Sequence, residues 1–95
     1  MEDLHNQTFV FVNEDHTLGN SLRHFLASHE HVEFAGYSVP HPAEPKMHLR
    51  VQSRGKTAID CVKESAEELK KHALHLRETF EYEITQFEEQ KDEER

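Results

Sequence analysis

The chain has little of what builds cross-linked, membrane-spanning or metal-clustering proteins. Its 95 residues include one cysteine, Cys61, and no tryptophan. One cysteine excludes an intrachain disulfide and a thiolate metal cluster. No stretch approaches the run of about 18 uninterrupted apolar residues that a membrane-spanning helix needs. The three prolines all fall within residues 40–45, and no glycine or proline interrupts residues 57–95, which leaves room for a long helix.

Positive charge is also scarce. Eleven Lys and Arg stand against 19 Asp and Glu, a formal net charge of -8. Direct binding to nucleic acid needs clustered cations, so the composition argues against it. The longest basic cluster, Lys70-Lys71, follows two glutamates and is interpreted as a solvated helix face. A cytosolic or nuclear location is the default expectation.

Histidine is the residue in excess, with nine copies. Most are interpreted as exposed surface residues. A histidine-dependent metal site or pH sensor is the rival interpretation, with His72 and His75 joined by His29 or His31. These spacings match no standard zinc site and no cysteine supports them, so no cofactor is expected. His16 has no nucleophile near it in sequence and is expected to order a strand-to-helix turn rather than to act as a base.

Hydrophobic periodicity predicts a single α+β domain over residues 1–95. Alternating or β-rich runs predict strands at residues 8–12, 32–39 and 47–51. Helical spacing predicts a short helix from about residue 18 to 28 and a long C-terminal helix beginning after Thr57, its expected N-cap. The expected architecture is a small mixed sheet of three or four strands with these two helices. Residues 1–7 and 88–95 are expected to fray.

Two local features of the strands are also predicted. Residues 8–12 have apolar side chains on both faces, which predicts that the first strand is covered on both sides. In the second strand the alternation changes phase after Phe34, and Ala35-Gly36 is the expected bulge.

The long helix carries more apolar surface than so small a sheet can cover. Its apolar residues recur at alternating steps of three and four, as in a coiled-coil seam about 45 Å long. Strands of five to eight residues span only about 17–26 Å. Part of the seam must therefore meet another chain, and the pattern predicts a module that dimerises through helices. The seam is formed by Ile59, Val62, Ala66, Leu69, Ala73, Leu76 and Phe80.

Two spaced blocks resemble a known signature. Residues 14–20, Glu-Asp-His-Thr-Leu-Gly-Asn, are followed by Leu22-Arg23, and after these come Val32-x-Phe34, Gly36-Tyr37 and His41-Pro42. The blocks resemble the small alpha-like subunits of archaeal and eukaryotic RNA polymerases, over roughly residues 8–87. Within that family, residues 36–47 are most similar to the nineteen-kilodalton-type subunit shared by RNA polymerases I and III. The equivalent subunit of RNA polymerase II is the alternative.

The resemblance implies a non-catalytic assembly subunit of DNA-directed RNA polymerases I and III. It would form a heterodimer with the larger alpha-like subunit, as a platform for the catalytic subunits, in the nucleolus and nucleoplasm of the nucleus. No membrane, cofactor or direct nucleic acid contact is implied. A free homodimeric interaction module is a third possibility.

The resemblance also implies which residues meet the partner. Gly19 is expected to permit close helix packing, with Asn20 satisfying a backbone group at the interface. Arg23 is either solvated or paired with a carboxylate, from Glu14, Asp15 or another subunit. From the short helix the expected interface comprises Leu18, Gly19, Asn20, Leu22, Phe25 and Leu26, and from the long helix the seam residues Ile59, Val62, Ala66, Leu69, Ala73, Leu76 and Phe80.

Overall fold

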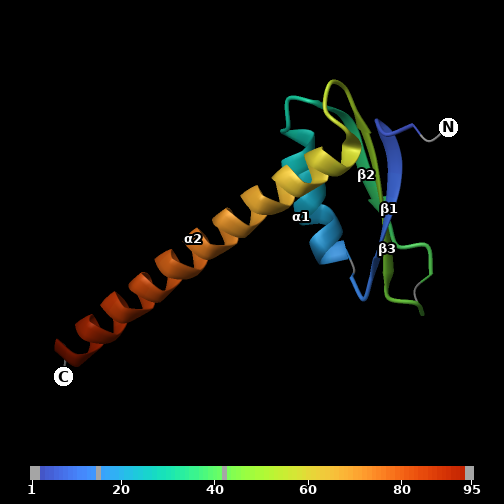
Figure 1. Ribbon diagram of the computed structural model, residues 1–95. Coiled ribbons are helices and arrows are strands. Elements are labelled where there is room, and N and C mark those ends of the chain that lie inside the picture. Colours follow the sequence, from blue (N-terminus) through green and yellow to red (C-terminus); the bar gives the residue numbers. More distant parts are fainter. Residues whose placement is uncertain (1–2, 15, 42, 94–95) are drawn as a thin grey trace.

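The computed structural model describes residues 3–14, 16–41 and 43–93. In chain order the elements are β1 (Asn6–Val12), α1 (His16–Ala27), β2 (Val32–Ser38), β3 (Lys46–Ser53) and α2 (Ala58–Glu93). Figure 1 shows a sheet with the short helix α1 beside it and the long helix α2 extending away from both. The α+β class and the two helices of unequal length are confirmed.

The sheet has the strand order β1-β3-β2. Both pairings are antiparallel, so the prediction of a mixed sheet is wrong for the described strands. Central strand β3 alternates between buried and more exposed residues along its length. Its inward side chains, Met47, Leu49 and Val51, form the core together with Leu22 and Leu26 of α1 and the start of α2.

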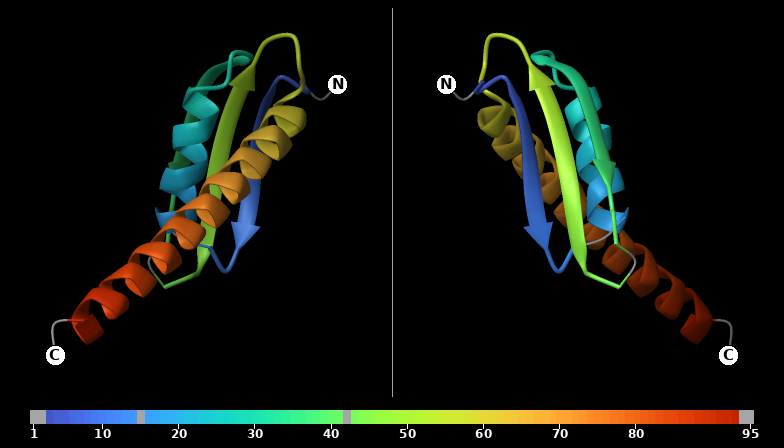
Figure 2. Two further views of the ribbon diagram at one scale, coloured as in Figure 1. Left: turned by 90° about the vertical axis from the view of Figure 1, so that its left-hand side faces the viewer. Right: turned by 90° about the vertical axis from the view of Figure 1, so that its right-hand side faces the viewer.

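Both helices lie on the same face of the sheet, as the two views of Figure 2 show. No described helix or strand covers the opposite face. Val10 and Val12 point to that open face and are exposed. The prediction that the first strand is covered on both sides is therefore wrong for the chain alone.

The irregularity in β2 lies earlier than predicted. The pairing with β3 shifts register between Val32 and Phe34, so Glu33 is the extra residue. Ala35 and Gly36 pair regularly with Val51 and Arg50. The glycine suggested the wrong position, because a bulge needs only one inserted residue and does not need a glycine.

Helix α2 begins where the sequence predicted. The Asp60 backbone N–H donates to the Thr57 side-chain hydroxyl at 3.4 Å, which makes Thr57 the N-cap. The preceding turn contains Gly55 with φ +88°, a left-handed conformation that suits glycine. The helix then continues without interruption to Glu93.

The outer part of α2 makes the molecule unusually extended. Its principal extents are 69 × 35 × 15 Å and its radius of gyration is 18.2 Å. A compact chain of this length has a radius of gyration of about 12 Å. β1 already begins at Asn6 and α2 reaches Glu93, so both ends have more regular structure than the sequence pattern indicated. Fraying of residues 1–7 and 88–95 concerns dynamics and stays a prediction.

Candidate dimerisation surface

The first three turns of α2 are packed against the rest of the chain. Its buried residues are Ala58, Cys61, Val62 and Ser65, and Leu69 is partly buried against the same core. They share a core with residues of α1 and β3, and Figure 1 shows this end of α2 beside α1. Burial raises the pKa of the Cys61 thiol, which disfavours the reactive thiolate.

The same helix face continues beyond His72, whose ring meets Phe25 of α1, and there no described residue of another element is packed on it. Successive residues of an α-helix are rotated by about 100°, so Leu76 lies five full turns after Ala58 and points in the same direction. By the same count, Phe80 and Phe87 deviate from that direction by about 40° and 20°. Leu76, Phe80 and Phe87 are 69%, 64% and 65% exposed. We call Leu76, Phe80, Ile84 and Phe87 the open stripe.

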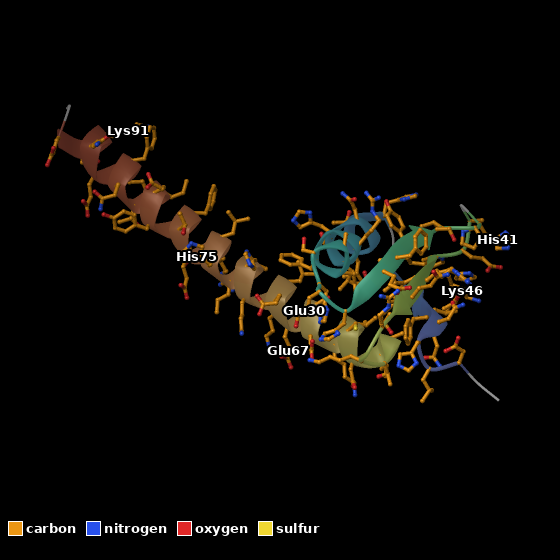
Figure 3. All side chains as sticks on the ribbon, turned by 90° about the horizontal axis from the view of Figure 1, so that it is seen from above. Glu30, His41, Lys46, Glu67, His75 and Lys91 are labelled. Carbon is orange, nitrogen blue, oxygen red and sulfur yellow. The ribbon has the colours of Figure 1, made fainter. Side chains whose placement is uncertain are left out.

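The exposed surface of the whole chain is larger than its size requires. A folded monomer of 11.2 kDa is expected to expose about 5,700 Å². This chain exposes 7,399 Å², about 1,700 Å² more. Large apolar side chains on such a surface are typical of an interaction site. In Figure 3 the side chains of the outer half of α2, near His75 and Lys91, stand away from the body of the molecule.

Helix α1 is used mainly inside the chain. Gly19, Leu22 and Leu26 are buried, whereas Leu18 and Phe25 are partly buried and Asn20 is exposed. A Cβ at Gly19 would lie 2.5 Å from Tyr37 Cδ2 and 2.6 Å from Met47 Sδ. The expected close approach is therefore present, but the neighbour is this chain's own sheet. Direct contact of Gly19, Leu22 and Leu26 with a partner stays a prediction, since all three are buried within this chain.

The seam predicted for α2 divides in the same way. Val62 is buried and Leu69 partly buried, whereas Ile59, Ala66, Ala73, Leu76 and Phe80 are exposed. Sequence reasoning missed the buried Ala58, Cys61 and Ser65, which lie on the inner side of the predicted seam. Their spacing of three and four residues is helical and could have predicted a buried face. Ser65 is polar, however, and so the apolar pattern did not include it. Contact of the seam with a partner stays a prediction.

Two further side chains of the signature find partners within the chain. The Arg23 guanidinium donates to Asn20 Oδ1 at 3.1 Å, so the amide faces a side chain of its own helix. His16 Nδ1 lies 3.3 Å from the Tyr37 hydroxyl, which ties the start of α1 to β2 as expected for a turn-ordering residue. Asp15, one of the predicted partners of Arg23, and Pro42 lie outside the described residues.

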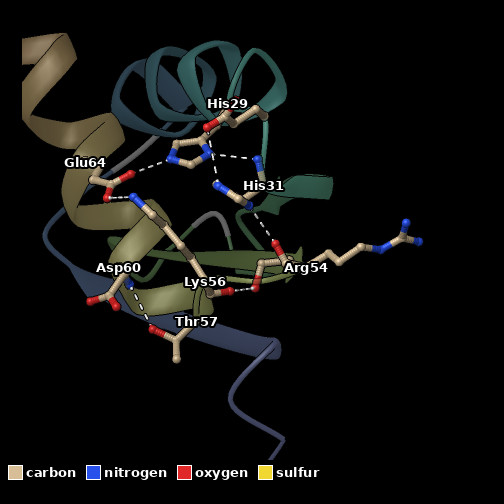
Figure 4. Close-up of polar contacts among 9 residues, drawn as sticks. His29, His31, Arg54, Lys56, Thr57, Asp60 and Glu64 are labelled. Carbon is tan, nitrogen blue, oxygen red and sulfur yellow. Dashed lines mark hydrogen bonds and ion pairs between the residues drawn. The ribbon is translucent and has the colours of Figure 1, made fainter.

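A polar cluster holds the base of α2 against the loop after α1 (Figure 4). The carboxylate of Glu64 accepts from Lys56 Nζ at 2.5 Å and from His29 Nε2 at 2.6 Å. These two hydrogen bonds, Lys56 first and His29 second, lower the pKa of Glu64. The hydrogen bond to Glu64 raises the pKa of Lys56. The cluster joins the second turn of α2 to the residues before the helix and to the loop after α1.

The tautomer of His29 follows from its second contact. The His31 backbone N–H donates to His29 Nδ1 at 3.1 Å, so that nitrogen has no proton and Nε2 donates to Glu64. The His31 ring in turn lies 2.9 Å from the Arg54 carbonyl oxygen. His29 and His31 thus form hydrogen bonds that link the loop after α1 to α2 and to the turn before it.

A third histidine helps α1 and α2 to pack. The Phe25 ring lies 4.9 Å from the His72 ring of α2 and 5.3 Å from the His24 ring, measured between centroids. His41 and His75 lie far apart (Figure 3). Within residues 3–14, 16–41 and 43–93, no three His, Cys, Asp or Glu side chains are grouped to hold a metal ion. The rival metal-site interpretation therefore has no ligand set in this part of the chain.

The described part of the chain also contains no helix that is both long and apolar enough to cross a membrane. The open stripe is the exposed apolar face of an amphipathic helix. Such a face supports association with another protein surface.

Comparison with known proteins agrees with an association surface. Residues 6–79 match the model of the RNA polymerase Rpb3/Rpb11 dimerisation domain. The DNA-directed RNA polymerases I and III subunit RPAC2 of Drosophila melanogaster is 48% identical over 82 residues, 86% of this chain and 78% of the relative. RPAC2 of Danio rerio is 42% identical over 90% of this chain and 77% of the relative. The RNA polymerase II subunit rpb11 of Dictyostelium discoideum is 37% identical over 76% of this chain and 61% of the relative.

Proposed function

The chain belongs to the RNA polymerase Rpb3/Rpb11 dimerisation-domain family, and we propose that it is a non-catalytic assembly subunit of DNA-directed RNA polymerases I and III. The observation that carries this proposal is the open stripe on a helix whose first turns are firmly packed. A domain of this family with an uncovered apolar helix face needs a second subunit to complete its core.

The proposed partner is the larger alpha-like subunit shared by polymerases I and III. The outer half of α2 would lie against the partner's helices, with Leu69, Ala73, Leu76 and Phe80 at the centre of the contact. Ile59 and Ala66 would lie at its edge, and Leu18, Asn20 and Phe25 would contribute from α1. Gly19, Leu22, Leu26 and Val62 would act from within, by fixing the positions of the two helices. The heterodimer would form the platform for the catalytic subunits.

Assignment to polymerases I and III rather than II is supported by the relatives. The I and III subunits of fly and zebrafish are 48% and 42% identical to the chain, whereas the polymerase II subunit is 37% identical over a shorter stretch. The corresponding location is the nucleus, with the nucleolus for polymerase I and the nucleoplasm for polymerase III. No side chain is proposed to take part in nucleotidyl transfer.

Co-expression tests the proposal. The chain is produced with the larger alpha-like subunit of polymerases I and III, and in parallel with the alpha-like partner of polymerase II. Native mass spectrometry should show a 1:1 heterodimer with the first partner and little or none with the second. Preference for the polymerase II partner would overturn the assignment. A stable homodimer that excludes both partners would favour the free interaction module instead.

A further inference from the structure

The face of the sheet that the helices leave open has an arginine at its centre. Arg50 lies on central strand β3, paired with Thr8 of β1 on one side and Gly36 of β2 on the other. It is exposed, between the inward-facing Leu49 and Val51. Neither of its cross-strand neighbours is acidic.

Arg50 has no carboxylate partner in residues 3–14, 16–41 and 43–93, although acidic residues outnumber basic ones 19 to 11. The cations at the two ends of the same face are both paired. Lys46 Nζ lies 3.8 Å from a Glu44 carboxylate oxygen, and Arg54 Nη2 lies 2.5 Å from Glu33 Oε1. The guanidinium at the centre is thus the charge on this face that remains available to another molecule.

An apolar surface lies beside this arginine. Phe34 is 49% exposed, and its ring lies along the strand over Gly36, 3.0 Å from where a Cβ of that residue would be. The absence of a side chain at Gly36 makes room for the ring, and a hollow of about 350 Å³ lies next to it. The hollow is lined by Thr8, Phe34, Gly36, Tyr37, Ser38, His48 and Arg50.

We propose that this open sheet face is a second docking surface, for a polypeptide segment that presents a carboxylate to Arg50 and an apolar side chain to Phe34 and the hollow. A guanidinium binds a carboxylate through two parallel hydrogen bonds, which gives the contact both strength and direction. The surface lies on the side of the sheet opposite α1 and α2, so a heterodimer formed through the helices leaves it free (Figure 2). The inference thus goes beyond the proposed heterodimer and names a contact to a further protein.

An acidic protein segment is favoured over a nucleic acid by charge. Phosphate binding draws on several cations, and this face offers one that is unpaired, in a chain of net charge -8. The net charge of -8 also repels an acidic peptide at long range. The proposed contact therefore depends on the short-range hydrogen bonds between Arg50 and one carboxylate.

The test uses the heterodimer, so that the open stripe on α2 is already covered. The chain is labelled with ¹⁵N, and amide shifts are followed during titration with a decapeptide of alternating Asp and Leu. Matched probes are a Lys-Leu decapeptide, an Asp-Ser decapeptide, a single-stranded oligonucleotide and unlabelled heterodimer. Arg50→Glu and Phe34→Ser test the two contacts, and Leu74→Asp, on a helix face away from the sheet, is the control for added charge.

The Asp-Leu peptide should shift the amides of Phe34, Gly36, His48 and Arg50. Arg50→Glu should weaken its binding at least tenfold and Phe34→Ser several-fold, while Leu74→Asp leaves it unchanged. Equal or tighter binding of the Lys-Leu peptide or the oligonucleotide would overturn the proposal. Shifts confined to the helices, or no shift at all, would do the same. Shifts with unlabelled heterodimer alone would identify a second copy as the occupant instead.

Discussion

The two halves of α2 belong to one continuous helix and present the same apolar face, but only the first half packs along its length, and the second half meets α1 only at its start, where His72 lies beside Phe25 among the described residues. Residues 58–69 lie on α1 and β3, where they bury Ala58, Cys61 and Val62. Residues 70–93 extend past the sheet and leave Leu76 and Phe80 exposed. The difference shows that the amphipathic pattern determines which face of a helix is apolar. The length of the sheet determines how much of that face the chain covers by itself.

The largest effect is expected when a leucine in the core is replaced by aspartate, compared with the same replacement on the outer half of α2. Leu26→Asp, in the core under the first half, should prevent folding, because Leu26 is fully buried and an unpaired buried carboxylate costs several kcal/mol. Far-ultraviolet circular dichroism and thermal unfolding measure the result. The control is Leu74→Asp, at a residue that is 55% exposed on the outer half of α2 and turned away from the open stripe, which should unfold like the wild type. A cooperative transition in the Leu26 variant would contradict this account of the core.

The next effect should appear in the outer half without loss of the fold. Leu76→Asp should leave the circular dichroism of the chain unchanged but weaken the heterodimer at least a hundredfold, which corresponds to about 3 kcal/mol. Leu74→Asp places the same charge two residues away on a different face and should change the affinity less than threefold. Titration calorimetry with the larger alpha-like subunit measures both variants. Equal losses of affinity in the two variants would show that added charge anywhere on α2 weakens the heterodimer. The open stripe would then not be the contact surface.

A smaller effect is expected where α1 meets the sheet. Gly19→Ala gains about 1 kcal/mol of helix propensity but forces a Cβ against Tyr37 and Met47, and such overpacking costs about 1–3 kcal/mol. The variant should be about 1 kcal/mol less stable in urea unfolding. Asn20→Ala, at the exposed neighbouring position, should change stability by less than about 0.5 kcal/mol. A more stable Gly19 variant would show that the methionine moves aside freely.

The smallest effect concerns the polar cluster that joins α2 to the loop after α1. The pKa of Glu64 lies below its ordinary 4.5, so its stabilising contacts are present above that pH and are lost as the pH falls through its folded pKa. The pKa of Lys56 is raised above 10.5, so its contribution is complete below that pH and is lost at higher pH. Glu64→Gln should therefore be less stable than the wild type between about pH 5 and 10, and the two should converge at lower pH. Glu67→Gln is the matched control, and a constant difference at all pH values would exclude ionisation as the cause.

The sequence was informative where the period of the pattern is long, as in α2. The step of three and four residues and the Thr57 cap predicted its start and its excess of apolar surface. The sequence was less informative about which residues or chains pack against each apolar position. Gly36 suggested a bulge that lies at Glu33, because the glycine is there to accommodate the Phe34 ring. Both faces of β1 are apolar, yet only one is covered by this chain, since a strand pattern does not state which chain supplies the cover.

The interface prediction shows the same limit. Leu22 and Leu26 fit the helical pattern of α1 and Leu76 fits that of α2, but the first two are buried in the chain's own core. Periodicity identifies apolar positions and cannot divide them between an internal and an external neighbour. That division depends on where the sheet ends beneath α2, which is a property of the three-dimensional arrangement.

Hydrogen exchange along α2, in the chain alone and in complex with the larger alpha-like subunit, tests the central claim most directly. Residues 58–69 should exchange slowly in both states, because they are packed within the chain. Residues 73–87 should exchange quickly in the free chain and at least tenfold more slowly in the complex, because the open stripe becomes covered. Exchange in residues 73–87 that is unchanged by the partner would contradict the account.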